Sequence, residues 1–403
     1  MSAAGSEGER ASSSRGRPSS RGRPSSRGRL SSRERLSSSR ITILSEGAFG
    51  IETAKTAASA VRYQPERVTS VIESRFAGRT VGETLGFGGD IPIVATFEEA
   101  LAHEPRPEAL LVGIAPQGGR LPDAWRAVLV AALEAGLDII SGLHLFFCDD
   151  PELAALAEQR GCTLFDLRKP PDDLPVGTGR AMRTEAFRVL TVGTDCNTGK
   201  MTVSLELQRA LAARGVRAAF AATGQTGILI AGRGIAVDAV VSDFISGAAE
   251  CLTLEAAADG GSAPDGGGAE IVLVEGQGSL MHPGYSGVTL GLLHGTLPQA
   301  MILTWMPSRP RIYGGNHGWV ELPDLDEIIR RYEGALAWAC PDVPGRVIGV
   351  SLATYDISEE EARAAVRHAR EVTGLPATDP IRFGAAPLAD AIIEARDAAA
   401  GPS

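Results

Sequence analysis

The feature of this 403-residue chain that most constrains its fold is the segment GTDCNTGKMT, residues 193–202. It follows an apolar run, FRVLTVG (187–193), and precedes an amphipathic stretch, VSLELQRALAAR (203–214), so the order is strand, glycine-rich loop, helix. In this context glycines let backbone N–H groups point inward, the helix N-terminus adds positive potential, and a lysine reaches phosphate oxygens. The segment therefore predicts a phosphate-binding P-loop.

The cofactor-binding residues that we expect are those of this loop, Gly193, Thr194, Asp195, Asn197, Thr198, Gly199, Lys200, Met201 and Thr202. Five residues separate Gly193 from Gly199, one more than in the usual Walker pattern. Met201 stands where that pattern has the Ser or Thr that binds Mg²⁺, and Thr202 lies about 100° further around the helix. Cys196 is interpreted as a small residue in a tight loop, although its thiol could accept an acyl group. Phosphate binding is thus better supported than Mg²⁺-assisted cleavage of ATP.

Short apolar runs alternate with helical patterns along the rest of the chain, which predicts an α/β fold with parallel sheets. The first runs lie at 41–44, 68–73, 109–115, 137–141 and 163–167, with a helix over 122–136. A second series lies at 187–193, 217–223, 270–276, 300–305 and 346–352, with a late helix over 358–371. We predict a Rossmann-like N-terminal domain over 41–170 and a P-loop NTPase-like C-terminal domain over 180–395, joined by a linker at 169–179. SEGAFG follows the first strand in place of GxGxxG, so no dinucleotide site is predicted.

Residues 1–40 differ sharply in composition from the rest of the chain. Four Ser/Arg-rich hexads occupy 13–36, and ten arginines against three glutamates give the segment a net charge of +7. Such a tract has too little apolar surface to offset its ordering entropy, so we expect a disordered arm over 1–40. It could bind RNA or another acid, but we favour a dispensable extension. The remaining chain carries a net charge of −17, which argues against nucleic acid as a partner.

The compartment is indicated by what the sequence lacks. Its five cysteines are scattered with no CxxC pair, which argues for reduced thiols and against a zinc site or a disulfide framework. No apolar run approaches the roughly 18 residues of a membrane span. We therefore expect a cytoplasmic protein with no membrane partner and no metal-ligand set.

The second segment with candidate catalytic residues is VEGQGSLMHPGYSG, residues 274–287, which directly follows a buried strand. A carboxylate at such a strand end commonly faces the P-loop, so Glu275 is a candidate general base or Mg²⁺ ligand. His282 in the same loop is a second candidate for acid–base chemistry. Gly276 and Gly278 would allow a close approach of the backbone.

Three further segments offer polar groups for a small substrate. ATGQTGILIAGRG (222–234) follows another strand, and VSDFISGAAE (241–250) precedes a helix. An arginine in SRPRIYGG (308–315) could pair with a carboxylate or a phosphate. The substrate-binding residues that we expect are Thr223, Gln225, Thr226, Asp243, Ser246 and Arg309.

These motifs together resemble a bacterial family, the D-glutamate N-acetyltransferase (DgcN) type, long catalogued as uncharacterised. The resemblance covers about residues 41–390. It rests on the P-loop and Glu275 segments, on VVSDFISGAAE and TGLPATDPIRFG in the C-terminal half, and on ILSEGAFG, VGIAPQGGRLP and DLRKPPDDLPVGTG in the N-terminal half. The P-loop half is also similar to dethiobiotin synthetase, which shares the GTDxxxGK loop.

The resemblance implies an N-acetyltransferase that moves acetyl from acetyl-CoA to the amine of a D-amino acid, D-glutamate above all. It also implies a pathway partner, an N-acyl amino acid epimerase, and we expect a homo-oligomer. The phosphates of coenzyme A would occupy the P-loop without being cleaved, which agrees with Met201 in place of a Mg²⁺ ligand. Two alternatives remain open: an ATP/Mg-dependent ligase or synthetase of the dethiobiotin-synthetase type, and a nucleotide-binding regulator without turnover.

Overall fold

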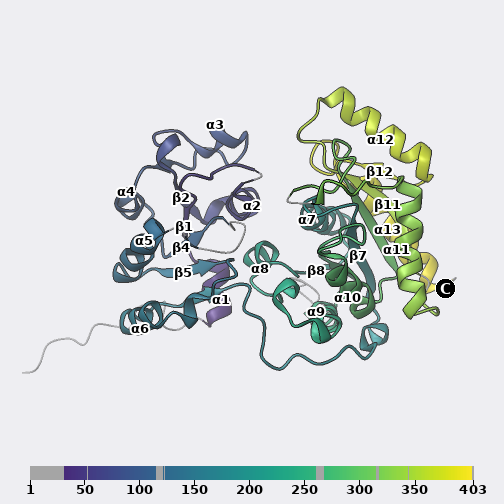
Figure 1. Ribbon diagram of the computed structural model, residues 1–403, viewed down its shortest axis with the longest axis horizontal. Helices are drawn as coiled ribbons and strands as arrows, with labels where there is room; N and C mark the ends of the chain where they lie inside the picture. Colours follow the sequence, from purple (N-terminus) through teal and green to yellow (C-terminus); the bar gives the residue numbers. More distant parts are fainter. Residues whose placement is uncertain are drawn as a thin grey trace, which may run out of the picture.

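A computed structural model of the protein describes residues 31–51, 53–114, 121, 123–259, 267–314, 317–343 and 345–401. It contains two six-stranded parallel sheets flanked by helices (Figure 1). The predicted α/β class, with a Rossmann-like first half and a P-loop second half, is confirmed.

The N-terminal sheet has the strand order β3-β2-β1-β4-β5-β6. Its strands are β1 (Ile41–Leu44), β2 (Val68–Ile72), β3 (Ile93–Val94), β4 (Ala109–Val112), β5 (Asp138–Ser141) and β6 (Leu164–Asp166). The helices that connect them are α2 (Lys55–Tyr63), α3 (Val81–Leu85), α4 (Phe97–Ala102), α5 (Asp123–Glu134) and α6 (Pro151–Arg160). The strand order reverses between β1 and β4, and this is the place where such sheets bind ligands at their carboxyl edge.

The C-terminal sheet has the order β12-β11-β10-β7-β9-β8. Its strands are β7 (Phe187–Gly193), β8 (Ala218–Ala221), β9 (Ile271–Val274), β10 (Ala300–Trp305), β11 (Arg346–Leu352) and β12 (Ala377–Thr378). Its helices are α7 (Lys200–Ala212), α8 (Gln225–Ala231), α9 (Ile245–Asp259), α10 (Ser286–Thr296), α11 (Leu325–Ala339), α12 (Glu359–Thr373) and α13 (Ala386–Ala400). Consecutive residues of the central strand β7 pack on opposite faces, Val189 in the cluster with α7 and α13 and Leu190 in the cluster with α9, α10 and α11. β7 is therefore covered on both faces.

Residues 31–40, which were expected to belong to a disordered arm, are folded. A capping box at Ser31 and Glu34 starts a short helix, α1 (Ser32–Ser38), and Leu36 of this helix is buried. Arg35 forms an ion pair with the buried Asp138, and Arg67 donates to the carbonyl oxygen of Leu36 at 2.6 Å. The hexad pattern hid this helix because its one buried apolar residue and its capping pair fall in the last repeat. The prediction for residues 1–30 lies outside the described residues.

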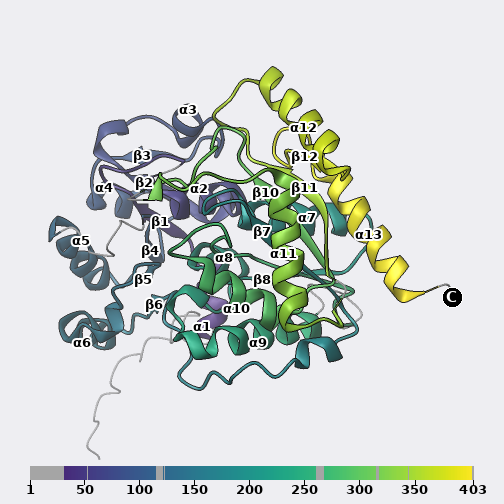
Figure 2. The ribbon, with the colours of Figure 1, turned by 45° about the vertical axis from the view of Figure 1, so that its right-hand side comes forward.

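The two sheets share one hydrophobic cluster. It combines the core of the N-terminal sheet with Phe220, Ile228 and Leu229 of the C-terminal half. Helix α8 lies between the sheets in both views and contacts α2 (Figures 1 and 2). Because the shared cluster is apolar and continuous, the two halves are expected to behave as one body rather than as hinged domains.

Polar contacts between the halves gather near the carboxyl ends of the strands. The Thr56 and Thr226 hydroxyls are 3.1 Å apart, and Arg168, two residues beyond β6, forms an ion pair with Asp238. Gln225 lies against Gly142, which directly follows β5. Both sheets therefore direct their ligand-binding edges toward the same region. Within the described residues, no helix is long and apolar enough to cross a membrane.

Removing residues 1–40 is expected to lower the free energy of unfolding by about 2 kcal/mol or more. The deletion would expose the apolar surface that Leu36 covers and would leave Asp138 buried without its arginine. Chemical denaturation of the chain starting at residue 41 measures this, with the chain starting at residue 31 as the control. Equal stability of the two truncated chains would contradict the role assigned to α1.

Candidate functional site

The P-loop joins the end of β7 to the start of α7. Asn197 and Gly199 adopt left-handed backbone conformations, with φ of 58° and 94°, and these two residues turn the loop over the helix N-terminus. The neighbouring strand β10 fixes the loop from the side: the Thr198 and Thr304 hydroxyls are 2.6 Å apart, and the Thr194 N–H donates to the Thr304 carbonyl at 3.0 Å. The loop thus has the shape that an anion-binding site requires.

Lys200 is the first residue of α7 and is buried. Its ammonium donates to the carbonyl oxygen of Asp195 at 2.8 Å, so the charge lies inside the loop. Burial lowers the pKa of Lys200. Burial in the loop removes water from the Lys200 ammonium. A bound anion would stabilise the charge in place of that water.

Tyr332 of α11 supports the P-loop from below. Its fully buried hydroxyl donates to the Gly193 carbonyl at 2.7 Å and accepts from the Leu280 N–H at 3.2 Å. One side chain therefore ties the P-loop to the loop that follows β9. No sequence pattern indicates this role, because a tyrosine within an amphipathic helix is an ordinary core residue.

Glu275 lies at the carboxyl end of β9 and is almost completely buried. Its Oε2 atom accepts hydrogen bonds from the Thr223 N–H at 3.0 Å and the Gly224 N–H at 3.2 Å. Burial raises the pKa of this carboxyl to about 7, against the opposing influence of these two N–H groups and of Lys200. A group that titrates near neutral pH can both accept and return a proton.

The backbone after Glu275 passes very close to β7. The Gly276 N–H donates to the Thr191 hydroxyl at 2.9 Å, and a Cβ atom on Gly276 would lie 1.7 Å from the Thr191 carbonyl oxygen. Only glycine permits this approach. The predicted close approach at Gly276 is therefore confirmed, and it fixes the position of Glu275 relative to the P-loop.

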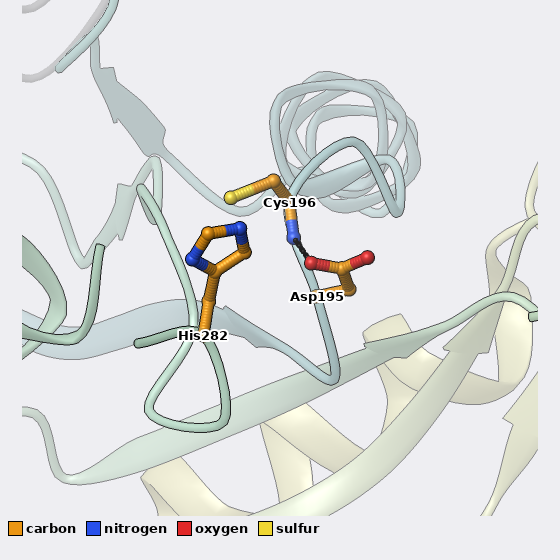
Figure 3. A group of neighbouring side chains, drawn as sticks. All are labelled: Asp195, Cys196 and His282. Carbon is orange, nitrogen blue, oxygen red and sulfur yellow. Dashed lines mark hydrogen bonds between the residues drawn. The ribbon is translucent and has the colours of Figure 1, made fainter. Parts of the chain in front are cut away.

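His282 comes close to the P-loop residues Asp195 and Cys196, with one ligand atom of each side chain within 4.8 Å of the others (Figure 3). The His282 Nδ1 atom accepts a hydrogen bond from the Gly284 N–H at 3.1 Å, so the neutral ring carries its proton on Nε2. Figure 3 shows Nε2 on the side of Cys196. Burial lowers the pKa of His282, which favours this neutral form. In this neutral form the ring can donate a hydrogen bond from Nε2, and its part in acid–base chemistry stays a prediction.

The same cluster has ligand types that can bind a metal ion, although no metal-ligand set was expected from the sequence. Both oxygens of Asp195 already accept backbone hydrogen bonds, from Cys196 at 2.6 Å and from Tyr313 at 2.8 Å. A metal would also need the Nε2 lone pair of His282, and the Gly284 hydrogen bond favours a proton there. The arrangement fits an anion or a carbonyl oxygen better than a cation.

The predicted substrate residues divide into two groups. Thr223 holds Glu275 with its N–H and donates its hydroxyl to the Glu275 carbonyl at 2.7 Å, and Gln225 and Thr226 follow it at the start of α8. Ser246 instead lies against Gly177 of the linker, after the exposed Asp243. The structure therefore brings the first three residues to the site, whereas Ser246 contacts the linker.

Two other predicted residues connect to the site only indirectly. The Arg309 guanidinium lies 4.2 Å from the ring centroid of Tyr313, whose N–H binds Asp195 of the P-loop. Thr202 lies beside the Tyr63 hydroxyl of α2, and burial together with Glu206 raises the pKa of that tyrosine. Thr202 thus faces the N-terminal half instead of the interior of the loop.

The chain matches a family described as a domain of unknown function, DUF1611. The P-loop part of the family matches residues 175–389, and the Rossmann-like part matches residues 74–170. The chain belongs to this family. The resemblance drawn from the sequence motifs is thereby confirmed.

Two named relatives align with most of this DUF1611 protein. A protein of Tritonibacter scottomollicae named D-glutamate N-acetyltransferase is 39% identical over 343 residues, which are 84% of this chain and 94% of the relative. A protein of the same name from a Pseudoalteromonas species is 37% identical over 69% of this chain and 79% of its own length. The crystal structure of a DUF1611 family protein from Anabaena variabilis superposes with a TM-score of 0.81 at 39% identity, covering 89% of this chain and all of that one.

Replacing Gly276 with alanine is expected to lower the free energy of unfolding by about 1–3 kcal/mol, because the new methyl group must push β7 and β9 apart. Gly287→Ala is the matched control, since a Cβ atom there meets nothing within 4 Å. Thermal denaturation of both variants checks the prediction. A Gly276→Ala protein as stable as the control would show that the site does not depend on this approach.

Proposed function

We propose that this protein transfers the acetyl group of acetyl-CoA to the amine of D-glutamate. Both named relatives are called D-glutamate N-acetyltransferase. The observation on this chain that best supports the proposal is a buried carboxyl, Glu275, with a pKa of about 7, placed beside a phosphate-binding loop. N-acetyl transfer requires such a group, because the attacking amine must lose a proton.

The donor set of the loop fits the phosphates of coenzyme A. Lys200 and the N–H groups at the start of α7 would bind a phosphate, as helix N-termini commonly do. Met201 packs against the hydrophobic cluster shared by the two halves, so its side chain is used for packing. A loop that binds phosphate without a Mg²⁺ hydroxyl at this position suits a donor whose phosphates stay intact.

The remaining groups have complementary roles. Glu275 in its ionised form accepts the proton that the substrate amine loses, and a thioester supplies the activated acyl group. The Nε2–H of His282 and backbone N–H groups of the loops are donors for the negative charge that develops on the acyl oxygen. The two acid–base candidates thus separate into a base, Glu275, and a donor, His282.

We also propose a setting for the reaction. All five cysteines are free thiols, which is consistent with the cytoplasm. We propose that the enzyme forms a homo-oligomer. We also propose that its product passes to an N-acyl amino acid epimerase.

A mass-spectrometric screen of D- and L-amino acids with acetyl-CoA tests the proposed activity. We expect N-acetyl-D-glutamate and free coenzyme A to form without ATP and in the presence of EDTA. Product formation that requires both ATP and Mg²⁺ would overturn the proposal in favour of the ligase. Nucleotide binding without turnover of any amino acid would favour the regulator.

Replacing Glu275 with glutamine is expected to reduce turnover by roughly 10²–10⁴-fold with little change in acetyl-CoA affinity. In the wild type the rate should rise with pH through about 7, because the base must be ionised, and the variant should lose this limb. The rise caused by deprotonation of the substrate amine, at higher pH, should remain in both. Steady-state kinetics from pH 5 to 10 distinguish the two limbs, and an unchanged profile would exclude Glu275 as the base.

The same shift predicts how stability depends on pH. A carboxyl whose pKa is raised from 4.5 to about 7 by folding stabilises the native state below pH 4.5, and this contribution is lost as the pH rises through 7. As the pH rises from 4.5 to about 7, the wild type should therefore lose stability relative to Glu275→Gln, whose side chain does not titrate. Urea denaturation at pH 5 and pH 8 measures the difference, and a constant difference would contradict the burial cost assigned to Glu275.

A further inference from the structure

A second lysine stands at the start of a helix in the N-terminal half. Lys55 begins α2 after the loop that follows β1, just as Lys200 begins α7 after the loop that follows β7. The residues preceding these helices, Ala54 and Gly199, have no side-chain group that could cap them. Each half therefore contains a central strand, a loop and a helix that opens with lysine.

A chain of contacts brings the start of α2 to the P-loop. Thr56 contacts Thr226 of α8, and the segment entering α8 holds Glu275, whose charge acts on Lys200. The Lys55 ammonium is close enough to the P-loop thiol of Cys196 to lower its pKa, although burial raises it overall. Figure 1 shows both α2 and α7 above α8.

The choice of lysine at position 55 is informative because the chain contains only three lysines among its 39 basic residues. Two of them are Lys55 and Lys200, and the third, Lys169, pairs with Asp149 at 2.7 Å on the surface. Arginine suits the planar fork of a carboxylate, whereas the compact ammonium of lysine is a common partner of phosphate at a helix start. Lys55 therefore shares with Lys200 its side-chain type and its place at a helix start, although Lys55 is exposed and Lys200 is buried.

A buried hydroxyl lies under the first turn of α2. Ser45 directly follows β1 and is fully buried, and its Oγ atom has no hydrogen-bond partner in the part of the chain that the structure describes. It lies against Gly113, where a Cβ atom would meet both Ser45 Oγ at 2.5 Å and the Cβ atom of Ala57 at 2.9 Å. A buried hydroxyl without a partner is costly, which points to a polar ligand at this edge of the sheet.

We propose that Lys55 and the start of α2 form a second phosphate-binding site, which acts with the P-loop to hold one acyl donor between the two halves. The proposal rests on acetyl-CoA as the donor. Coenzyme A carries phosphate at two places, the pyrophosphate and the ribose 3′-phosphate, and a bipartite site provides a cation for each. The N-terminal half would then be part of the binding site and not only a scaffold.

Calorimetric titration with coenzyme A, which does not turn over alone, tests the proposal. We expect Lys55→Ala to weaken binding roughly tenfold or more and Lys55→Arg to weaken it less, while Lys169→Ala binds like the wild type. Binding of 3′-dephospho-coenzyme A identifies the phosphate: equal affinities of the wild type and Lys55→Ala for it would assign Lys55 to the 3′-phosphate. If circular dichroism shows that Lys55→Ala is poorly folded, the affinities of Lys55→Arg and Lys169→Ala for coenzyme A are compared instead. Weaker binding by Lys55→Arg supports the proposal, and equal binding overturns it.

Unchanged affinity for coenzyme A in a folded Lys55→Ala protein would overturn the proposal. A raised KM for D-glutamate with an unchanged affinity for coenzyme A would also overturn it and assign Lys55 to a substrate carboxylate. Failure of the proposed function has a different signature. If the wild type binds ATP in place of coenzyme A, the acetyltransferase proposal fails, and the same variants titrated with ATP test the second phosphate site.

Discussion

The hydrogen bonds from Thr223 and Gly224 to the Glu275 carboxylate are the interaction on which the rest of the site depends. They join the end of β9 to the start of α8, and α8 in turn packs on α2 of the other half. A buried carboxyl is tolerated there because two N–H groups and a nearby lysine compensate part of its desolvation. The position of one carboxyl therefore links the P-loop, the segment that leads into α8 and the interface between the halves.

This arrangement explains why the chain needs two sheets for one site. A P-loop sheet alone would leave α8 and the start of α7 open to solvent, where the electrostatic effects of Lys200 and Glu275 would be weakened. The N-terminal half covers α8 with apolar contacts and with the pair Thr56–Thr226. Excluding water in this way strengthens each charge interaction at the carboxyl edges and keeps the pKa of Glu275 near neutrality.

Much of this was predictable from the sequence, for physical reasons. Buried parallel strands are apolar runs, and every strand of four or more residues falls within or across a predicted run, whereas the two-residue strands β3 and β12 are too short to leave a pattern. The P-loop could be predicted because phosphate binding needs fixed residue types at fixed spacing. Glu275 was a candidate because it directly follows a buried strand. The tautomer of His282, the support from Tyr332 and the packing of α1 depend on contacts across the fold. Such contacts have no local signal, and the α1 segment also lies in a repeat whose composition favours disorder.

The proposed chemistry depends above all on a Glu275 carboxyl that is held ready to exchange a proton near neutral pH. Carbon-13 NMR titration of glutamate-labelled protein, with Glu275→Gln to assign the resonance, measures this property directly. We predict a side-chain carboxyl that titrates with a midpoint of about 7 and is missing from the variant. A midpoint near 4.5, the ordinary value for glutamate, would contradict this prediction and remove the candidate base from the site.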